Sequence, residues 1–293
     1  MRAELLQKTV GVLEDYNFDI LFYLHSCLDI AAQKKAFMML IKVLENIDGF
    51  RTEHAEELKR LSSYLNSYPI LIGETTKAER MQDGTIYDRH GVSSITVNTL
   101  ESSLEGAYPE KIYSKGRMIA NIDGSVLEEY RKRKRVSLDD LASEIKLTKE
   151  SIYLYEHERM RVRYEIAKRI EEFLNASIIT PKSPFIAQEK RDARPRTDVE
   201  KKLFLFDFEV YPFQKLNFDI GAKDKRHKLI VRETPLGDIS KAVRFSNFFK
   251  TFLAVVSDKK SKDILVIEKE EFMAVSSKRD LVRLIRERSA LNN

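Results

Sequence analysis

The stretch SLDDLASEIKLTKESIYLYEHE, residues 137–158, carries the signals for two short helices joined by a brief turn. Ser137 and Thr148 can each cap a helix, because a hydroxyl accepts a hydrogen bond from a free N–H group at a helix start. Two short helices with a capping signal at each start suit a crossed pair. A plain helical bundle is the alternative, because Leu, Ile and Tyr at i, i+3 and i+4 suit any packed helix.

Helical signals continue on both sides of this stretch, from Asp123 to about Thr180, and strand signals are absent there. Gly124 and Ser125 can open a helix before residue 137. The sequence therefore predicts a compact all-α unit of four helical segments. The last segment is marked by apolar residues at i, i+4, i+7 and i+8, which are Ile166, Ile170, Phe173 and Leu174.

Both flanks mix strand-like apolar runs with amphipathic helices, which predicts α/β structure. A polar segment with three prolines, TPKSPFIAQEKRDARPRTDVEKK at 180–202, has the profile of an exposed linker. We therefore predict an α/β domain at 1–120, an all-α domain at 121–180, a linker at 181–202 and an α/β domain at 203–293. The predicted strands are SCLDIAA (26–32), AFMMLIKVL (36–44), PILIG (69–73), SSITVN (93–98), LNFDIG (216–221), HKLIVRE (227–233), KTFLAVVS (250–257) and DILVIE (263–268), and the predicted helices are EHAEELKRLSSYL (53–65) and SKRDLVRLIRER (277–288).

The composition is that of a soluble globular protein, with 43% hydrophobic and 33% charged residues. The longest uncharged apolar run, 36–41, is far shorter than the ~20 residues of a membrane span. Charged residues scattered through the first residues do not suit a secretory signal, so we expect a cytoplasmic protein. The balance of 51 Lys and Arg against 46 Asp and Glu, or +5, permits a polyanionic partner without demanding one.

Cysteine and histidine give no sign of a metal site. Cys27, the one cysteine, excludes an internal disulfide, and we expect it to pack as a small apolar side chain and not to act as a nucleophile. The five histidines do not have the spacing of H-x-x-E-H or H-E-x-x-H. We predict no metal, no cofactor and no catalytic residue, and the sequence lacks the glycine-rich motifs of kinases, dehydrogenases and hydrolases.

Residues 126–174 resemble a helix-turn-helix domain of the lambda-repressor/Cro type, with four or five helices. In that family the second helix carries an Ala that lets the third approach, and the third helix ends in an aromatic residue and Glu. The pairs Leu141-Ala142 and Tyr155-Glu156 match these positions, so the motif runs from Ser137 to Glu156. Lys146 departs from the family, because the turn position is usually Gly and a non-Gly residue at positive φ is strained by roughly 1 kcal/mol or more.

The resemblance implies that the third helix, residues 148–157, reads the major groove of double-stranded DNA. If Ile152 and Tyr155 face the core, other residues of this helix face outward. Lys149 can donate to guanine, Glu150 can accept from cytosine, and Tyr153 can reach a thymine methyl group or a phosphate. The predicted contacts of this helix and of the two caps are Ser137, Leu138, Thr148, Lys149, Glu150, Ser151, Tyr153 and Leu154.

Two basic clusters border the motif. RKRKR at 131–135 precedes the second helix, and Arg159, Arg161 and Arg163 follow the third. These clusters suit phosphate contacts, and we predict Arg131, Arg133, Arg159 and Arg161 for this role. A solvated charged face is the alternative for either cluster alone.

The N-terminal region, with SCLDIAAQKKAFMMLIKVLENIDGF, EELKRLSSYL, PILIG and DGTIYDRHGVSSI, resembles the PD-(D/E)xK nuclease fold. It looks like that of an archaeal family of regulators that place such a restriction-endonuclease-like domain before a lambda-type reader. An active site of this fold needs an Asp and a Glu-x-Lys, because two carboxylates hold Mg²⁺. Asp29 and Lys42 fit, but Leu40 stands in the Glu position and cannot bind a hard cation. Glu53 or Glu56 would be the substitutes if the carboxylate had migrated.

The C-terminal flank is a candidate degenerate copy of the first. The interval from Asp219 to Arg232 equals that from Asp29 to Lys42, and Ile230 stands in the carboxylate position. Coincidence in an apolar-rich sequence is the alternative.

We therefore expect a sequence-specific, double-stranded-DNA-binding transcriptional regulator that is a homodimer, responds to an unknown effector and makes no membrane contact. The rivals are a Mg²⁺-dependent nuclease targeted by the central domain and a scaffold whose helical domain binds protein. The operator, the sign of regulation and the regulated genes are not encoded in recognisable form.

Overall fold

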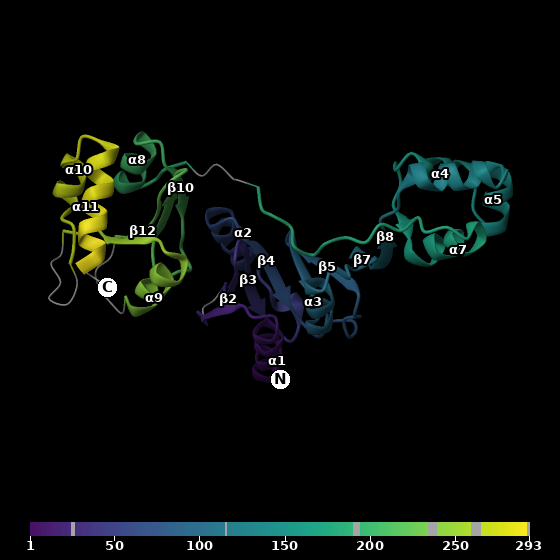
Figure 1. The fold of residues 1–293 in the computed structure, drawn as a ribbon, viewed down its shortest axis with the longest axis horizontal. Helices are drawn as coiled ribbons and strands as arrows, with labels where there is room; N and C mark the ends of the chain where they lie inside the picture. The colour runs from purple at the N-terminus through teal and green to yellow at the C-terminus, as the bar shows by residue number, and fades with distance from the viewer. Residues whose placement is uncertain (25–26, 115, 190–193, 234–238, 259–264, 292–293) are drawn as a thin grey trace. The chain divides into compact units, whose positions relative to one another are not determined.

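The computed structural model describes residues 1–293 apart from 25–26, 115, 190–193, 234–238, 259–264 and 292–293 (Figure 1). His25 and parts of the predicted strands at 26–32 and 263–268 and of the predicted linker lie outside the described residues. The chain divides into two compact units, each assembled from separate segments. One unit comprises Met1–Tyr16, Val43–Phe50 and Ile70–Ile186, and the other comprises Asn17–Lys42, Arg51–Pro69 and Ala187–Asn293.

The first 120 residues are mixed α/β, as predicted. Their strands belong to a sheet with the order β1-β2-β3-β4-β6-β5-β7-β8-β9. β1, β2 and β3 are antiparallel to one another, while β4 pairs with β6 and β5 with β7 in parallel. The elements are α1 (Arg2–Asp15), β1 (Asp19–Phe22), β2 (Ile30–Lys34), β3 (Phe37–Val43), the 3-10 helix η1 (Ile47–Gly49), α2 (Thr52–Leu65), β4 (Tyr68–Ile72), β5 (Thr85–Arg89), β6 (Val92–Ile95), α3 (Val97–Leu104), β7 (Lys111–Ser114) and β8 (Arg117–Ala120).

Local sequence explains most of these elements. The apolar run of β3 is buried from Met39 to Val43, and α2 buries Leu58, Leu61 and Leu65 at helical spacing. These predictions, and that of β4, are confirmed. The predicted strand at 93–98 instead ends at Ile95, because the Thr96 hydroxyl accepts a hydrogen bond from Thr99 N–H and starts α3.

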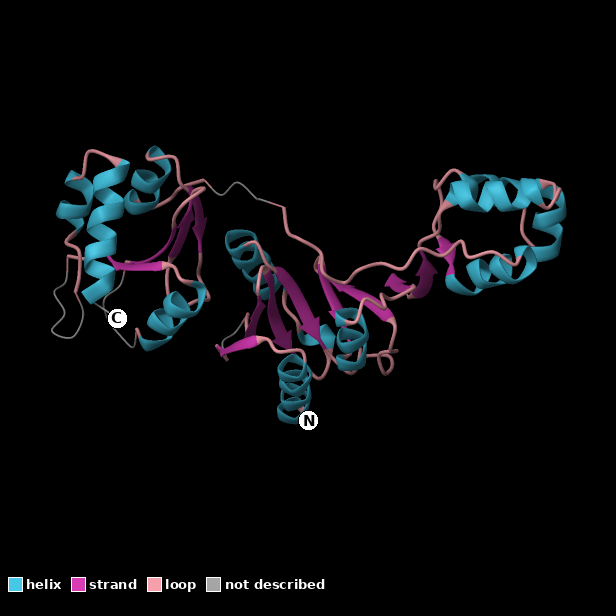
Figure 2. Ribbon diagram, viewed as in Figure 1, coloured by secondary structure: helices cyan, strands magenta, loops and turns pink. Residues whose placement is uncertain are grey.

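Residues 121–180 contain four α-helices, where four helical segments were predicted, and they are grouped together in Figure 2. Their core includes Leu127, Leu141, Ile152 and Ile170, all fully buried. The start of α4 touches the end of α6 so closely that a Cβ at Gly124 would overlap a backbone carbonyl. The elements are α4 (Gly124–Arg133), α5 (Leu138–Ile145), α6 (Lys149–Glu156), the short strand β9 (Val162–Arg163), which pairs with β8, and α7 (Tyr164–Leu174).

The C-terminal part is a second α/β arrangement, with the sheet order β10-β11-β12-β13. Helices α8, α10 and α11 lie close together in Figure 1, and they share one apolar core with the strands, to which they contribute Val199, Phe272 and Leu281. The elements are α8 (Asp198–Leu205), β10 (Glu209–Pro212), β11 (Ile220–Lys223), β12 (Lys228–Arg232), α9 (Ser240–Phe249), β13 (Phe252–Val255), α10 (Lys269–Ala274) and α11 (Lys278–Leu291).

Two boundaries differ from the predictions here. α8 begins at Asp198, within the predicted linker, because Thr197 and Glu200 form a reciprocal capping box. In the predicted strand at 263–268, the described residues form only a single bridge, from Ile267 to Val256.

The same order of elements occurs twice: a helix, three antiparallel strands, a helix and a strand. In the first set Ile30 pairs with Ile41, and in the second Ile220 pairs with Val231. The residue before each pair donates its N–H across the ladder, from Asp29 to Ile41 O at 3.0 Å and from Asp219 to Val231 O at 2.9 Å. The two sets therefore share strand register as well as order.

Candidate functional site

The α5–α6 pair is built by its caps. The Ser137 hydroxyl accepts from Asp140 N–H, and the Asp140 carboxylate accepts from Ser137 N–H. The Thr148 hydroxyl accepts from Ser151 N–H at the start of α6. Between the helices Lys146 has φ 58°, the left-handed conformation that ends α5. The turn expected to need Gly is therefore made by a lysine.

One face of the pair is buried. Leu141, Ala142 and Ile145 of α5 pack with Ile152 and Tyr155 of α6, and each is at most 4% exposed. Ile152 and Tyr155 are the residues of α6 that were expected to face the core. Their burial fixes which side of α6 remains available.

The other face of α6 is accessible. Lys149, Glu150 and Tyr153 are exposed, while Ser151 and Leu154 are half-buried. These residues project from the first two turns of the helix, as the side chains that enter a groove must.

Neighbours on the same surface hold two of these side chains. Lys149 Nζ lies 2.9 Å from Asp139 Oδ2, and that hydrogen bond raises the pKa of Lys149. The Tyr153 ring stacks on His157 with 4.1 Å between centroids. Both contacts are exposed to solvent and therefore weak, so contacts with a ligand can replace them.

The remaining predicted contacts at the helix starts have roles within the fold. The hydroxyls of Ser137 and Thr148 are the caps described above, and Leu138 is half-buried against the core of the four helices. Any contact from these residues to a ligand would come in addition to these roles.

Arg131 is buried and paired within the fold, whereas a phosphate contact requires an exposed side chain. Its Nε and Nη2 donate to the two carboxylate oxygens of Glu156 at 2.6 and 3.1 Å, and Nη1 donates to Val136 O at 2.9 Å. The Arg131 side chain is 9% exposed and the Glu156 side chain 2%. The prediction treated Arg131 as part of a basic run, whereas its i, i+4 spacing from the core residue Leu127 was the signal for burial.

The other predicted basic residues are exposed. Arg133 stacks over the Tyr130 ring at 4.5 Å, and Arg161 donates to the Ser114 hydroxyl at 3.3 Å. Arg159 and Arg161 also line a hollow of about 420 Å³ next to the end of β8. Their contact with phosphate stays a prediction.

The nuclease-like position contains a buried ion pair. Lys42 Nζ lies 3.2 Å from Asp29 Oδ1, and both side chains are almost fully buried. Leu40, two residues before Lys42 on β3 and so on the same face, is fully buried as well. Partial burial and then the charge of Lys42 lower the pKa of His54. The place of the second carboxylate is thus filled by an apolar side chain.

The substitutes considered for that carboxylate are paired elsewhere. Glu56 lies 2.6 Å from Lys59 Nζ, and Glu53 lies 3.8 Å from Lys215 Nζ. Within the described part of the chain, no group of three or more His, Cys, Asp or Glu side chains is placed to hold a metal ion. In the C-terminal set, Asp219 Oδ2 accepts from Glu233 N–H at 2.8 Å, and Ile230 is fully buried.

Helix α2 supplies a buried carboxylate that was not predicted. Glu57 Oε1 accepts from the backbone N–H groups of Gln214 and Lys215 at 2.6 and 2.7 Å, and Oε2 accepts from Arg60 at 2.9 Å. On the same helix the Tyr64 hydroxyl donates to Leu229 O at 2.8 Å. These contacts place the loop after β10 on α2, close to His54, whose pKa is lowered by burial and then by the charges of Lys42, Arg51 and Lys215. Their partners are more than 150 residues apart in sequence, so no local pattern announces them.

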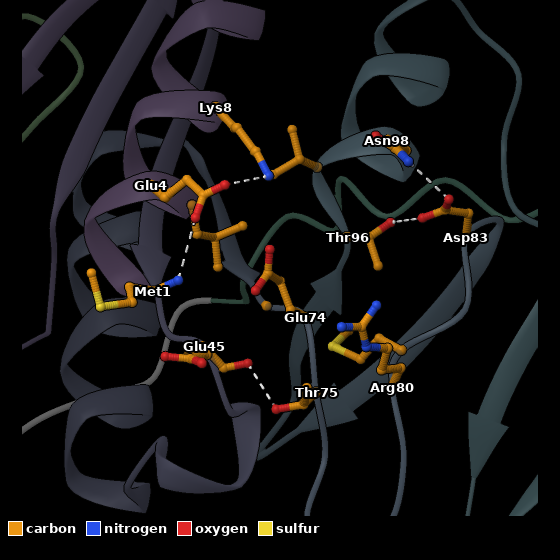
Figure 3. A pocket seen from close by; sticks show the side chains of 14 residues that line it. Met1, Glu4, Lys8, Glu45, Glu74, Thr75, Arg80, Asp83, Thr96 and Asn98 are labelled. Atoms are coloured by element: carbon orange, nitrogen blue, oxygen red, sulfur yellow. Dashed lines mark hydrogen bonds and ion pairs between the residues drawn. The ribbon is translucent and has the colours of Figure 1, made fainter.

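A polar hollow of about 570 Å³ is lined by α1, by the segments that follow β3 and β4, and by the start of α3 (Figure 3). Glu4 pairs with Lys8 at 3.1 Å, and Asp83 accepts from Thr96 Oγ1 at 2.5 Å and from Asn98 at 2.9 Å. Its labelled side chains mostly pair with one another, as the dashed lines in the figure indicate. The sequence did not predict this hollow.

Cys27 is fully buried, and burial raises the pKa of its thiol to about 12. A thiol in this state is a poor nucleophile. This agrees with the expected packing role. Within the described residues, no helix is both long and apolar enough to cross a membrane.

Residues 2–109 match the family model of the PD-(D/E)XK superfamily domain, a nuclease-type fold, in agreement with the expected N-terminal resemblance. A protein of Methanococcus maripaludis named "Putative HTH-type transcriptional regulatory protein" is 36% identical over 180 residues, which are 61% of this chain and 55% of that protein. Proteins with the same description occur in Archaeoglobus fulgidus, 27% identical over 99% of both chains, and in Methanothermobacter thermautotrophicus, 29% identical over 94% of this chain and 83% of that protein. No solved structure matches this chain.

Proposed function

We propose that this chain is a sequence-specific transcriptional regulator that binds double-stranded DNA through a helix-turn-helix domain at residues 121–180. The observation that carries the proposal is the division of α6: Ile152 and Tyr155 are buried, while Lys149, Glu150 and Tyr153 are exposed at the start of the helix. A capped pair of short helices with one such face is the arrangement that enters a major groove. The names given to the archaeal relatives support it.

Each side chain has a role in this proposal. Lys149 donates to guanine, Glu150 accepts from cytosine N4, and Tyr153 contacts a thymine methyl group or a phosphate. Arg133, Arg159 and Arg161 hold the phosphate backbone. Arg131 is not assigned a phosphate contact, because its guanidinium group is already paired with Glu156.

The protein acts in the cytoplasm as a homodimer in this proposal, since one reader contacts one half-site and two half-sites lie about 34 Å apart or a multiple of that. The α/β parts serve dimerisation or the sensing of an effector. The C-terminal part is a degenerate copy of the N-terminal nuclease-like fold, which the shared element order and strand register support.

The test has two steps. Fragments of genomic DNA that the purified protein retains are sequenced to obtain the operator. Gel-shift titrations then compare the parent with Lys149→Ala and Glu150→Ala, and with Lys201→Ala and Glu172→Ala as exposed controls outside the motif. We expect each α6 variant to lose about 1–3 kcal/mol of discrimination at one base pair, and the controls to behave like the parent. Unchanged affinity and preference in both α6 variants would show that this face does not read DNA.

The second candidate is a Mg²⁺-dependent nuclease, which the PD-(D/E)XK match favours. The fully buried Leu40 opposes it, because a cation would have one carboxylate, Asp29, already paired with Lys42. Incubation of the parent with DNA and Mg²⁺ decides between the two. An Asp29→Asn, Lys42→Met double variant is the control for contaminating nuclease, since it removes both charges together and leaves neither unpaired. Cleavage by the parent alone would establish the nuclease.

A further inference from the structure

One face of the C-terminal helix α11 is strongly basic. Together with the turn between β11 and β12, this helix lines a hollow of about 730 Å³. The lining contains five Lys and Arg side chains and two carboxylates, Asp224 and Glu287. The basic residues are Arg226, Lys278, Arg279, Arg283 and Arg286.

The helix presents this face because its opposite side is held in the core. Leu281 and Ile285 are fully buried, and the Ser289 hydroxyl accepts from Leu253 N–H at 3.0 Å. Arg279, Arg283 and Arg286 are spaced i, i+4 and i+7, so they follow one another along the other side of the helix. All three are exposed.

Asp224 serves the turn and does not neutralise this face. It accepts from the backbone N–H groups of Arg226 and His227 at 2.7 Å and lies 2.8 Å from Lys278 Nζ. Although burial acts in the opposite direction, these hydrogen bonds keep the pKa of Asp224 well below its usual range. Its negative charge therefore interacts with Lys278 and with the backbone N–H groups of the turn.

The arginines themselves are weakly engaged. Among the described residues, no carboxylate lies within ion-pair distance of Arg226 or Arg279. Arg283 is 73% exposed, and its contacts with Asp280 and Glu287 are long, at 3.9 and 3.8 Å. Arg286 lies over the Phe252 ring at 5.2 Å, which orients the guanidinium group without neutralising it.

We propose that the basic α11 face, formed by Arg226, Arg279, Arg283 and Arg286, is a second DNA contact that binds the phosphate backbone without reading sequence. The inference rests on the proposed DNA-binding function. Seven residues of helix span about 10 Å, and a DNA strand carries a phosphate about every 3.4 Å along its axis, so the arginines can meet about three successive phosphates. Arginine suits this role because its planar fork donates two hydrogen bonds to one phosphate.

The test measures how the affinity for a duplex without the operator depends on salt. Fluorescence anisotropy between about 50 and 200 mM salt compares the parent with the variant Arg279→Gln, Arg283→Gln, Arg286→Gln. The charge-matched control is Lys8→Gln, Lys201→Gln, Lys269→Gln, at exposed positions away from the hollow. In a plot of log affinity against log salt concentration, we expect the magnitude of the negative slope to be smaller by about 2 to 3 in the α11 variant. Its affinity near 0.1 M salt should fall about tenfold or more.

A second variant has two substitutions, Arg226→Gln and Arg279→Gln, and keeps the test valid if the triple variant misfolds. The magnitude of its slope should be smaller by about 2. The same slope as the parent in both α11 variants, or an equal fall in the control, would overturn the inference. If the parent binds operator DNA and Lys149→Ala changes its preference, the proposed function stands whatever the α11 variants do. If the parent binds no DNA, both proposals fail.

Discussion

Arg131 and Glu156 form the most deeply buried ion pair among the described residues of helices α4 to α7. Arg131 lies in the last turn of α4, and Glu156, 25 residues away, is the last residue of α6. Two parallel N–H···O bonds hold the pair in one geometry. Because the pair ties α4 to α6, it fixes the helix whose exposed face is proposed to read DNA.

Removal of one partner should be more harmful than removal of both. We expect Arg131→Ala to lower the free energy of unfolding of the helices α4 to α7 by about 3 kcal/mol, since it leaves the Glu156 carboxylate buried without a partner. The double variant Arg131→Met, Glu156→Leu should recover most of this loss. Urea denaturation followed by circular dichroism measures both.

Arg133→Ala is the matched control, because this neighbouring arginine is exposed and stacks only on Tyr130. Its effect should stay within about 0.5 kcal/mol. A loss in Arg131→Ala no larger than in Arg133→Ala would contradict a structural role for the pair.

Helix α5 depends on its capping box, and the box depends on pH. The hydrogen bond from the Ser137 hydroxyl, and then that from Ser137 N–H, lower the pKa of Asp140 below its usual value of 3.8. The folded state thus binds a proton less readily than the unfolded state does. The stabilisation is fully present above pH 3.8 and is lost as the pH falls toward the lowered pKa.

We expect amide hydrogens of α5 to lose protection from exchange as the pH falls below 3.8, after correction for the intrinsic exchange rate. In Asp140→Asn this pH dependence should flatten. Asp139→Asn, on the same turn but outside the box, should keep the parent's profile. Identical profiles for the two variants would rule out the box as the cause.

At the scale of single helices and strands, the sequence was most informative about helices. Caps at Ser137 and Thr148 and the spacing of Ile152 and Tyr155 predicted α5, α6 and their buried face, because these signals act within a few residues. Short strands such as β1 and β10 were missed, since a strand of four residues leaves little periodic signal. The partner of Arg131, Glu156, lies 25 residues away on another helix, where local spacing gives no signal.

At the scale of the whole molecule, one compact unit combines segments that are far apart in the sequence. Residues 17–42 and 51–69 belong to the same unit as the C-terminal part. Glu57, at 3% exposure, bonds the loop after β10, and Lys223 Nζ donates to Ser63 O at 2.6 Å. Tyr64 packs its ring against Tyr211 and Phe213. These contacts support a C-terminal part that folds onto α2.

Glu57→Ala should loosen this attachment. Two backbone N–H groups lose a charged acceptor, so we expect a loss of about 2 kcal/mol or more, seen as faster hydrogen exchange in β10 and β11. Glu53→Ala removes the same charge from an exposed position of α2, 71% exposed, and should leave that exchange unchanged. Equal effects of the two substitutions would mean that net charge, and not the buried bonds, holds the parts together.

The contacts in this unit are reciprocal. Glu57 of α2 meets the residues after β10, while Arg244 of α9 donates to the carbonyl oxygen of Phe22 at the end of β1, and α9 and β10 occupy the places of α2 and β1 in the second set. Such exchange is what a twofold symmetric pair of separate molecules displays. Because one chain carries both halves, their effective concentration is set by the connecting segment and not by the amount of protein in the cell. This internal pair therefore cannot dissociate on dilution, whatever happens to any assembly of whole chains.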